Sequence, residues 1–245
     1  MTILQNYRLV LSYDGTDFCG WQRQPRERTV QGVLEDALAK LAQKKVPVCG
    51  AGRTDAGVHA LAQVANFKVS LPLRNGELFR ALNALLPEDV RVTSVRRAGP
   101  DFHARVMAKS KVYQYRIFNA RNVSPFLQRY VLYWPWRLEL VRMRQAAALF
   151  AREADFGAFS SNRLLHPVRK VTRSTVRKTG DEIVYTIEAK GFLRYMVRTI
   201  VGTLIEVGRG KIPPEEIETI FRSGKRSLAS PTALAKGLCL VKVKY

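Results

Sequence analysis

The sequence predicts an α+β protein made of two similar halves, in which antiparallel sheets carry helices packed on one face. Three observations predict this class: short segments with apolar residues at every second position, longer segments with an apolar helical stripe, and the recurrence of both kinds along the chain. The 245 residues suffice for one large domain or two of ordinary size. We place a boundary between residues 1–105 and 106–245, although neither a low-complexity segment nor a clear repeat marks it.

The first half opens with a predicted strand at Tyr7–Tyr13, where apolar and aromatic side chains alternate until Asp14-Gly15 forms a turn. A helix is predicted from Val30 onward, with Thr29 as its N-cap and Lys44-Lys45 beyond its C-terminal end, where cations suit the helix dipole. The other predicted elements of this half are a strand at Gln63–Val69, a helix over Leu78–Leu86 and a strand at Val90–Val95.

The second half contains the same kinds of segment. Strands are predicted at 112–118, 168–177, 182–189 and 238–243, and helices at 138–150, 194–207 and 214–221. Two halves of this composition are typical of RNA-recognition-like domains.

The charge balance favours a polyanionic partner. The chain has 41 Lys and Arg against 20 Asp and Glu, a formal net charge of +21. Residues 1–105 hold 15 basic and 10 acidic side chains, so their net charge is +5, and residues 106–245 hold 26 and 10, a net charge of +16. A field of this size attracts nucleic acid, and we expect the second half to make more of the phosphate contacts. The alternative is a generally basic protein with solvated Lys and Arg faces.

The cysteine and histidine spacings argue against a disulfide framework and against a bound metal. Neither a CxxC pair nor a histidine pair at ligand spacing occurs among Cys19, Cys49, Cys239, His59, His103 and His166. Arg8 interrupts the apolar N-terminus, and no apolar run reaches the length of a membrane span. We therefore expect a cytoplasmic protein that binds no metal and enters no membrane.

The segment Gly50–Gly57 is the one best suited to chemistry. It begins as a GxGxxG pattern, but the third glycine position is occupied by Asp55, and no GK[ST] follows. A carboxylate there would repel pyrophosphate, so no nucleotide cofactor is expected. A carboxylate among glycines and the small Ala56 instead allows a bulky substrate to approach the backbone.

The segment Gly52–Ala60, GRTDAGVHA, resembles the signature loop of the tRNA pseudouridine synthase A family. Further matches follow in the family's order over nearly the whole chain: YDGT at 13–16, GWQ at 20–22, YQYRI at 113–117, FLRYMVR at 192–198 and GL at 237–238. One departure is the segment SPTALA at 230–235, since the family tends to have glycine and proline where Ser230 and Leu234 stand. This departure concerns the path of the loop, not the chemistry.

The resemblance implies a homodimeric, cofactor-independent enzyme that isomerises uridine to pseudouridine at positions 38–40 in the anticodon stem-loop of tRNA. A single ionised carboxylate, assigned to Asp55, can attack ribose C1′ or remove the C2′ proton, and both routes stay open. A glycosidase would need a second carboxylate beside it, which the motif does not offer.

The resemblance also assigns partners to Asp55 and to the target base. Arg198 would pair with Asp55, because a guanidinium keeps a partly desolvated carboxylate charged. Without the motif, Arg198 would be read as a surface arginine. Tyr113 would contact the target base and is a candidate to take the proton lost from C5, whereas we assign Tyr115, on the same strand face, to the core.

Two further loop residues are substrate-binding candidates. Arg53 could stack on bases or bind phosphate and so hold the space from which uridine is extracted, although an arginine in a glycine loop can also bind backbone. For His59 we favour a structural role, in which it holds the loop, over a role as a proton shuttle.

Two rival functions remain. A non-catalytic RNA-binding protein would be served equally well by the positive charge and by Trp21, Trp134 and Trp136, but it would gain nothing from Asp55. A synthase of the same fold could also act on other RNAs, since the motif defines the chemistry better than the target.

Overall fold

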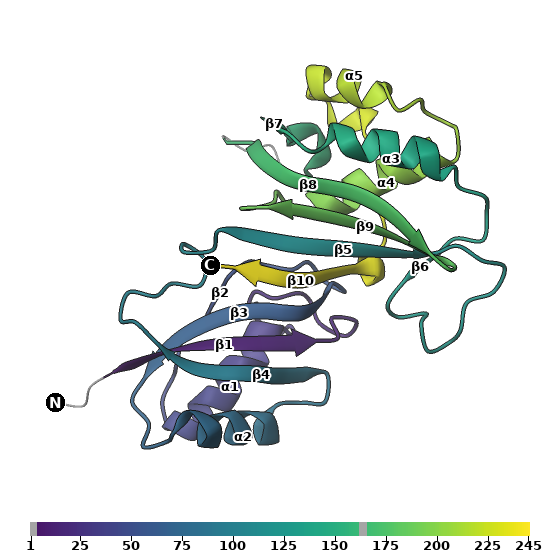
Figure 1. Ribbon diagram of the computed structural model, residues 1–245. Coiled ribbons are helices and arrows are strands. Elements are labelled where there is room, and N and C mark those ends of the chain that lie inside the picture. Colours follow the sequence, from purple (N-terminus) through teal and green to yellow (C-terminus); the bar gives the residue numbers. More distant parts are fainter. Residues whose placement is uncertain (1–3, 162–165) are drawn as a thin grey trace. The chain divides into compact units, whose positions relative to one another are not determined.

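The computed structural model describes residues 4–161 and 166–245 (Figure 1). The chain forms two compact units: the first contains residues up to Lys109 together with Leu240–Tyr245, and the second contains Ser110–Cys239. The C-terminal residues thus belong to the first unit. A single boundary after residue 105 does not describe this arrangement. It stays a prediction that the first half carries the catalytic loop and that the second half is the strongly basic one.

The first unit is an antiparallel sheet with two helices. Across this sheet the strands are β4 (Val90–Ala98), β1 (Gln5–Tyr13), β3 (His59–Val69) and β10 (Leu238–Lys244), with the short β2 (Cys49–Gly50) also paired to β3. Both helices, α1 (Val30–Ala42) and α2 (Asn75–Leu85), cover the same face of the sheet (Figure 1).

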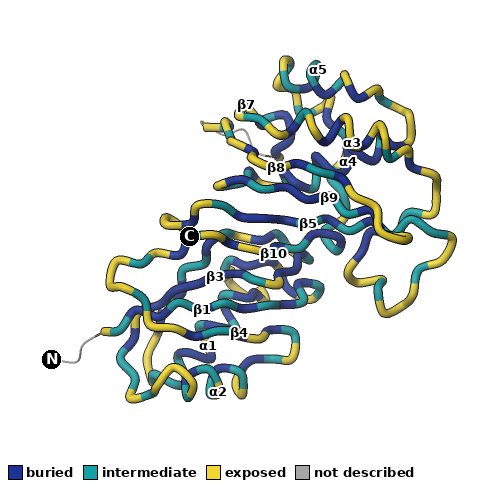
Figure 2. The backbone as a smooth tube through the Cα atoms, viewed as in Figure 1, coloured by how far each residue is buried: buried dark blue, intermediate teal, exposed yellow. Residues whose placement is uncertain are grey.

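The core of this unit follows the predicted patterns. Tyr7, Leu9 and Leu11 alternate along β1 and are fully buried, as the period of two predicts. On α1, Leu34 and Leu38 are also fully buried. The alternation of buried and more accessible positions along the strands is visible in Figure 2. The predicted N-cap is confirmed, because Thr29 Oγ1 accepts a hydrogen bond from the backbone N–H of Gly32.

In its described residues, the second unit repeats this plan with further antiparallel strands and three α-helices. Its strands, in order, are β5 (Ser110–Phe118), β9 (Glu182–Ala189), β8 (Val168–Thr179) and β7 (Glu153–Asp155), and β6 (Leu132–Tyr133) pairs in parallel with β5. Its helices are α3 (Leu140–Leu149), α4 (Met196–Gly208) and α5 (Glu216–Ser223). The predicted α+β class with two similar antiparallel halves is therefore confirmed.

The core of the second unit is built around α4 and a group of aromatic side chains. Almost every residue of α4 is buried, so this helix is enclosed by protein instead of lying on the surface. Phe150, Phe159 and Phe221 have ring centroids 5.1–5.7 Å apart, and their mutual packing joins α5 to the end of α3.

Several element boundaries differ from the predicted ones. The helix predicted from Arg194 begins at Met196, because Tyr195 has a left-handed φ of 61° that interrupts helical geometry. The strand predicted from Gln63 begins at His59, inside the segment we had read as a loop. The short strands β2, β6 and β7 were not predicted. Within residues 4–161 and 166–245, every helix is too short or too polar to span a bilayer.

Candidate active site

The loop that carries Asp55 connects β2 to β3 in the first unit, and its ends are fixed by backbone and amide hydrogen bonds. The Ala51 N–H donates to the carbonyl of Val64 at 2.7 Å, and Gln63 Nε2 donates to the carbonyl of Gly52 at 2.9 Å. The Val58 N–H donates to the carbonyl of Asp55 at 3.1 Å, which closes a turn. The backbone of Asp55 thus has a defined conformation.

A second loop, Asp14–Trp21, packs along the first and holds its centre. The Trp21 N–H donates to the carbonyl of Thr54 at 3.0 Å, and the hydroxyl groups of Thr54 and Tyr13 lie 2.8 Å apart in the interior. A further bond runs from the Gly57 N–H to the carbonyl of Phe18, 3.3 Å away. Thr54, the residue before Asp55, is therefore bound through both its carbonyl and its hydroxyl.

Glycine is needed where the two loops touch. A Cβ on Gly15 would lie 2.0 Å from the carbonyl oxygen of Val58. Gly20 has a φ of +89°, and a Cβ there would lie 2.6 Å from the carbonyl oxygen of Thr54. Only glycine permits this separation of the two backbones. The resemblance had matched both loops separately, and the structure shows that they form one packed pair.

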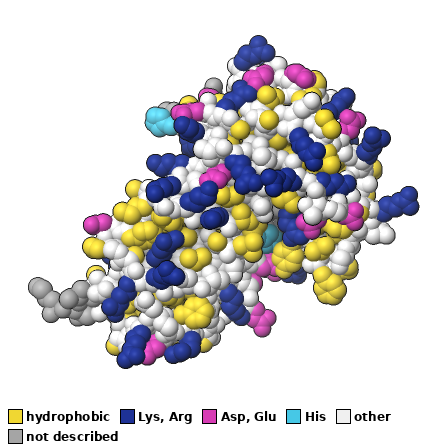
Figure 3. Space-filling model, in the orientation of Figure 1, with side chains coloured by type: hydrophobic (Ala, Val, Ile, Leu, Met, Phe, Trp, Pro, Cys, Tyr) yellow, Lys and Arg dark blue, Asp and Glu magenta, His cyan; other side chains and the backbone are white. Residues whose placement is uncertain are grey.

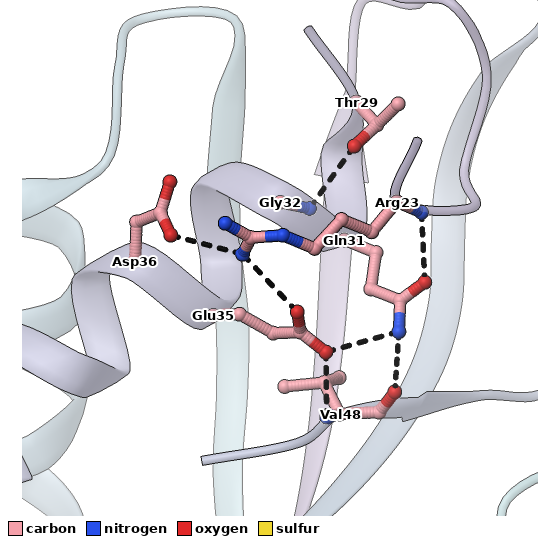
Figure 4. Close-up of polar contacts among 7 residues, drawn as sticks. All are labelled: Arg23, Thr29, Gln31, Gly32, Glu35, Asp36 and Val48. Carbon is pink, nitrogen blue, oxygen red and sulfur yellow. Dashed lines mark hydrogen bonds and ion pairs between the residues drawn. The ribbon is translucent and has the colours of Figure 1, made fainter. Parts of the chain in front are cut away.

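The same two loops are tied to α1 through Glu35 (Figure 4). One carboxylate oxygen of Glu35 accepts from the Val48 N–H at 3.1 Å, just before β2. The other accepts from Arg23 Nη1 at 3.2 Å, just after Trp21. Gln31 adds a second bridge, because its amide accepts from the Arg23 N–H and donates to the carbonyl of Val48, both at 3.0 Å. The segment before the Asp55 loop and the segment after the second loop are thus fixed to one helix.

Three predicted site residues lie on the Asp55 loop or at the start of β3, which follows it. Asp55 is half-buried and Arg53 is exposed, while Thr54 between them is buried. His59 is also buried, with Nδ1 at 3.0 Å from the backbone nitrogen of Gly15 and 3.1 Å from Asp14 Oδ1. An Nδ1 without a proton accepts from Gly15, and a protonated one donates to Asp14. In either state, His59 joins the base of its loop to the neighbouring one.

Tyr113 lies on β5 of the second unit. It is buried, and its ring meets that of Phe192 edge to face with centroids 5.2 Å apart. Tyr115, two residues along, is fully buried and donates its hydroxyl to the carbonyl of Leu234 at 2.7 Å. Burial raises the pKa of the Tyr115 phenol, and the nearby positive charge of Arg198 offsets part of that rise. The core position predicted for Tyr115 matches this environment.

Arg198 lies in the first turns of α4 and is half-buried. Its Nε donates to the carbonyl of Ala233 at 2.8 Å, and its guanidinium lies 5.0 Å from the ring centroid of Tyr195. The Ala233 N–H donates back to the carbonyl of Arg198 at 3.1 Å. The segment in which the sequence departs from the family pattern therefore packs along α4 at Arg198. The expected pairing of Arg198 with Asp55, on the other unit, stays a prediction.

Two features of these loops could not be found from the sequence patterns. Trp21 is only 2% exposed, so it is not available as one of the three tryptophans that could serve the rival RNA-binding function. Tyr13 is an anchor for Thr54 as well as a core residue. Among the described residues, no group of three or more His, Cys, Asp or Glu side chains is arranged to hold a metal ion.

Comparison with known proteins agrees with the motifs. A model of the tRNA pseudouridine synthase family matches residues 9–105 and 146–245. The chain is 45% identical over 249 residues to tRNA pseudouridine synthase A of Solidesulfovibrio magneticus, covering 97% of this chain and 90% of that protein. It is 42% identical over 252 residues to tRNA pseudouridine synthase A of Thermodesulfovibrio yellowstonii, covering 98% and 99%.

The family model includes both the Asp55 loop and α4 with Arg198, and the relatives align along almost their entire length. The chain therefore belongs to the tRNA pseudouridine synthase family and is an isomerase.

Proposed function

We propose that this protein isomerises uridine to pseudouridine at positions 38–40 in the anticodon stem-loop of tRNAs, in the cytoplasm and without a cofactor, with Asp55 as the catalytic carboxylate. The observation that carries the proposal is the anchoring of the backbone at Asp55. The Asp55 carbonyl accepts from the Val58 N–H, and Thr54, directly before it, is held by the Trp21 N–H and the Tyr13 hydroxyl. A carboxylate on so constrained a backbone is positioned before substrate arrives.

The reaction breaks the bond between ribose C1′ and uracil N1 and forms a bond between C1′ and C5, while the hydrogen on C5 leaves as a proton and N1 gains a proton. Atoms balance without an oxidant, a reductant or a second substrate. Asp55 acts on the sugar, either by attack on C1′ or by removal of the C2′ proton.

The remaining site residues have supporting roles in this proposal. Tyr113, held by Phe192, contacts the target base and accepts the C5 proton directly or through water. Arg198 pairs with the Asp55 carboxylate and keeps it ionised. Arg53, exposed beside Asp55, occupies the space left by the extracted uridine, and His59 holds the loop.

The target positions are tested with tRNA transcripts that carry uridine at only one of positions 38, 39 and 40. Pseudouridine formation is then mapped after carbodiimide treatment and reverse transcription. We expect a signal at each of the three positions and none in a transcript with cytidine at all three. A signal only in uridines outside the anticodon arm would show that the proposed target positions are wrong, while the proposed reaction would stand.

We also propose that the enzyme is a homodimer, so that the basic surface of both subunits holds one tRNA. Lys and Arg side chains are spread over the face shown in Figure 3, as the net charge of +21 leads one to expect. Light scattering under the conditions of the activity assay tests this proposal. A dimeric mass is expected, and a monomeric mass in an active sample would overturn it.

A further inference from the structure

The segment 119–138, between β5 and α3, contains three arginines and no acidic residue. It also holds five aromatic residues, of which Phe126 and Trp136 are strongly exposed. This combination of positive charge and exposed rings lies outside the region matched by the family model, which resumes at residue 146. It therefore calls for an explanation other than core packing.

Trp136 is exposed but firmly held. The residue is 64% exposed, and its ring meets that of Trp134 edge to face with centroids 5.0 Å apart. Asn119 Nδ2 donates to the carbonyls of both Trp134 and Trp136 at 2.8 Å. The Trp134 N–H donates to the carbonyl of Phe118 at the end of β5, 2.9 Å away. The exposed ring is thus presented by a backbone anchored to the sheet.

One cationic group packs against the tryptophan pair, and another follows the pair in sequence. The guanidinium of Arg209 lies 5.5 Å from the ring centroid of Trp134, and its Nη1 is fixed by Glu206 at 2.7 Å. Arg137, exposed, follows Trp136 directly. An aromatic face beside positive charge has the chemistry that binds an unpaired nucleotide, whose base stacks on the ring while its phosphate pairs with arginine. An acidic or purely apolar partner would not use both features.

We propose that Trp136 is a stacking platform for an unpaired nucleotide of the RNA substrate, with Arg137 and Arg209 beside it to bind the phosphate backbone. This inference rests on the proposed function only in taking RNA as the ligand. It adds an RNA contact on the second unit that does not involve the Asp55 loop. It also assigns two of the arginines of that unit to phosphate binding.

The test is the affinity of the full-length protein for a fluorescein-labelled tRNA transcript, measured by anisotropy. Trp136→Ala is expected to weaken binding about tenfold or more, the effect of losing one base–aromatic stack. Trp136→Phe keeps a ring and is expected to remain within about threefold of the wild type. The matched control is Val141→Ala, because Val141 is equally exposed, at 66%, but has no ring to stack.

Salt dependence separates stacking from charge. Trp136→Ala removes no charge, so the slope of log affinity against log salt should stay the same, whereas Arg137→Gln should reduce that slope by about one. Equal binding by wild type and Trp136→Ala would overturn the proposal, as would equal losses in Trp136→Ala and Val141→Ala. A change of mass in Trp136→Ala, seen by light scattering, would also overturn it, since the ring would then join protein copies.

Failure of this inference is distinguishable from failure of the proposed function. If the wild type forms pseudouridine but binds tRNA no better than Trp136→Ala, the stacking platform is wrong and the activity stands. If binding depends on Trp136 but the wild type forms no pseudouridine in any tRNA, the platform stands and the activity is wrong.

Discussion

The hydroxyl groups of Tyr13 and Thr54 lie 2.8 Å apart in the interior of the first unit. Tyr13 ends the first strand, and Thr54 directly precedes Asp55. This bond is a side-chain link between the sheet and the backbone that presents the carboxylate. The behaviour of Asp55 should therefore depend on residues whose side chains never take part in the reaction.

The Tyr13 and Thr54 hydroxyls are expected to be energetically coupled. Tyr13→Phe leaves the Thr54 hydroxyl buried without this partner and should lower the free energy of unfolding by about 1–3 kcal/mol. Thr54→Val should have a similar effect, but the double variant should be less destabilised than the sum of the two by about 1 kcal/mol. Urea denaturation of the four proteins measures the coupling, and simple additivity would show that the hydrogen bond contributes nothing.

Gly20 is expected to tolerate no side chain. Gly20→Ala places a methyl group 2.6 Å from the Thr54 carbonyl at a φ of +89°, so it should lower the unfolding free energy by about 1–3 kcal/mol and reduce activity. Gly76→Ala is the matched control, because Gly76 lies in α2 with nothing within 4 Å of the added Cβ. That substitution should leave stability unchanged or slightly increase it. Equal stability of the two variants would show that the loops do not need this close approach.

Glu35 and Asp36 both bind Arg23, but only Glu35 also accepts from Val48 and Gln31. Glu35→Ala should therefore destabilise the protein by about 1–3 kcal/mol, since it leaves the N–H of the buried Val48 without this partner. Asp36→Ala removes only an exposed ion pair and should cost less than about 1 kcal/mol. Thermal unfolding of the two variants compares these effects. A larger loss of stability in Asp36→Ala than in Glu35→Ala would show that Glu35 is not the residue that holds the two loops.

The larger elements were predictable because their signals are local. The helix beginning at Val30 was predicted with its cap, since the apolar stripe and Thr29 lie within one short segment. The beginning of α4 was misplaced because the left-handed conformation of Tyr195 has no signal in the neighbouring side chains. The burial of Trp21 could not be predicted either, because it results from packing against Gly50, nearly thirty residues away in sequence.

The candidate site divides in the same way. Asp55 was identified from nine consecutive residues, a pattern long enough to be specific. The residues that anchor its loop were not identified, because the alternating pattern of the strand makes Tyr13 look like an ordinary core residue. The tryptophans illustrate the same limit: composition groups Trp21 with Trp136, and only the tertiary structure separates a buried side chain from an exposed one.

Removing the cation at Arg198 should change the pH dependence of the reaction. If Arg198 keeps the Asp55 carboxylate ionised, Arg198→Gln makes that carboxylate easier to protonate. The acid limb of kcat/KM should then move to higher pH, so activity is lost earlier as the pH falls. Arg198→Lys keeps the charge and should leave the limb nearer its original position, although it loses the planar Nε–H bond to Ala233. An unmoved limb in Arg198→Gln would contradict the pairing.

The central claim, that Asp55 performs the isomerisation, is tested most directly by tritium release from a tRNA transcript that contains 5-tritiated uridine. Rejoining the sugar at C5 must expel that hydrogen, so release reports the reaction itself. Asp101→Asn is the matched control, because it makes the same chemical change at an exposed carboxylate of the first unit. We predict release by the wild type and by Asp101→Asn, and none above background by a folded Asp55→Asn. Release by Asp55→Asn at the wild-type rate would contradict the account.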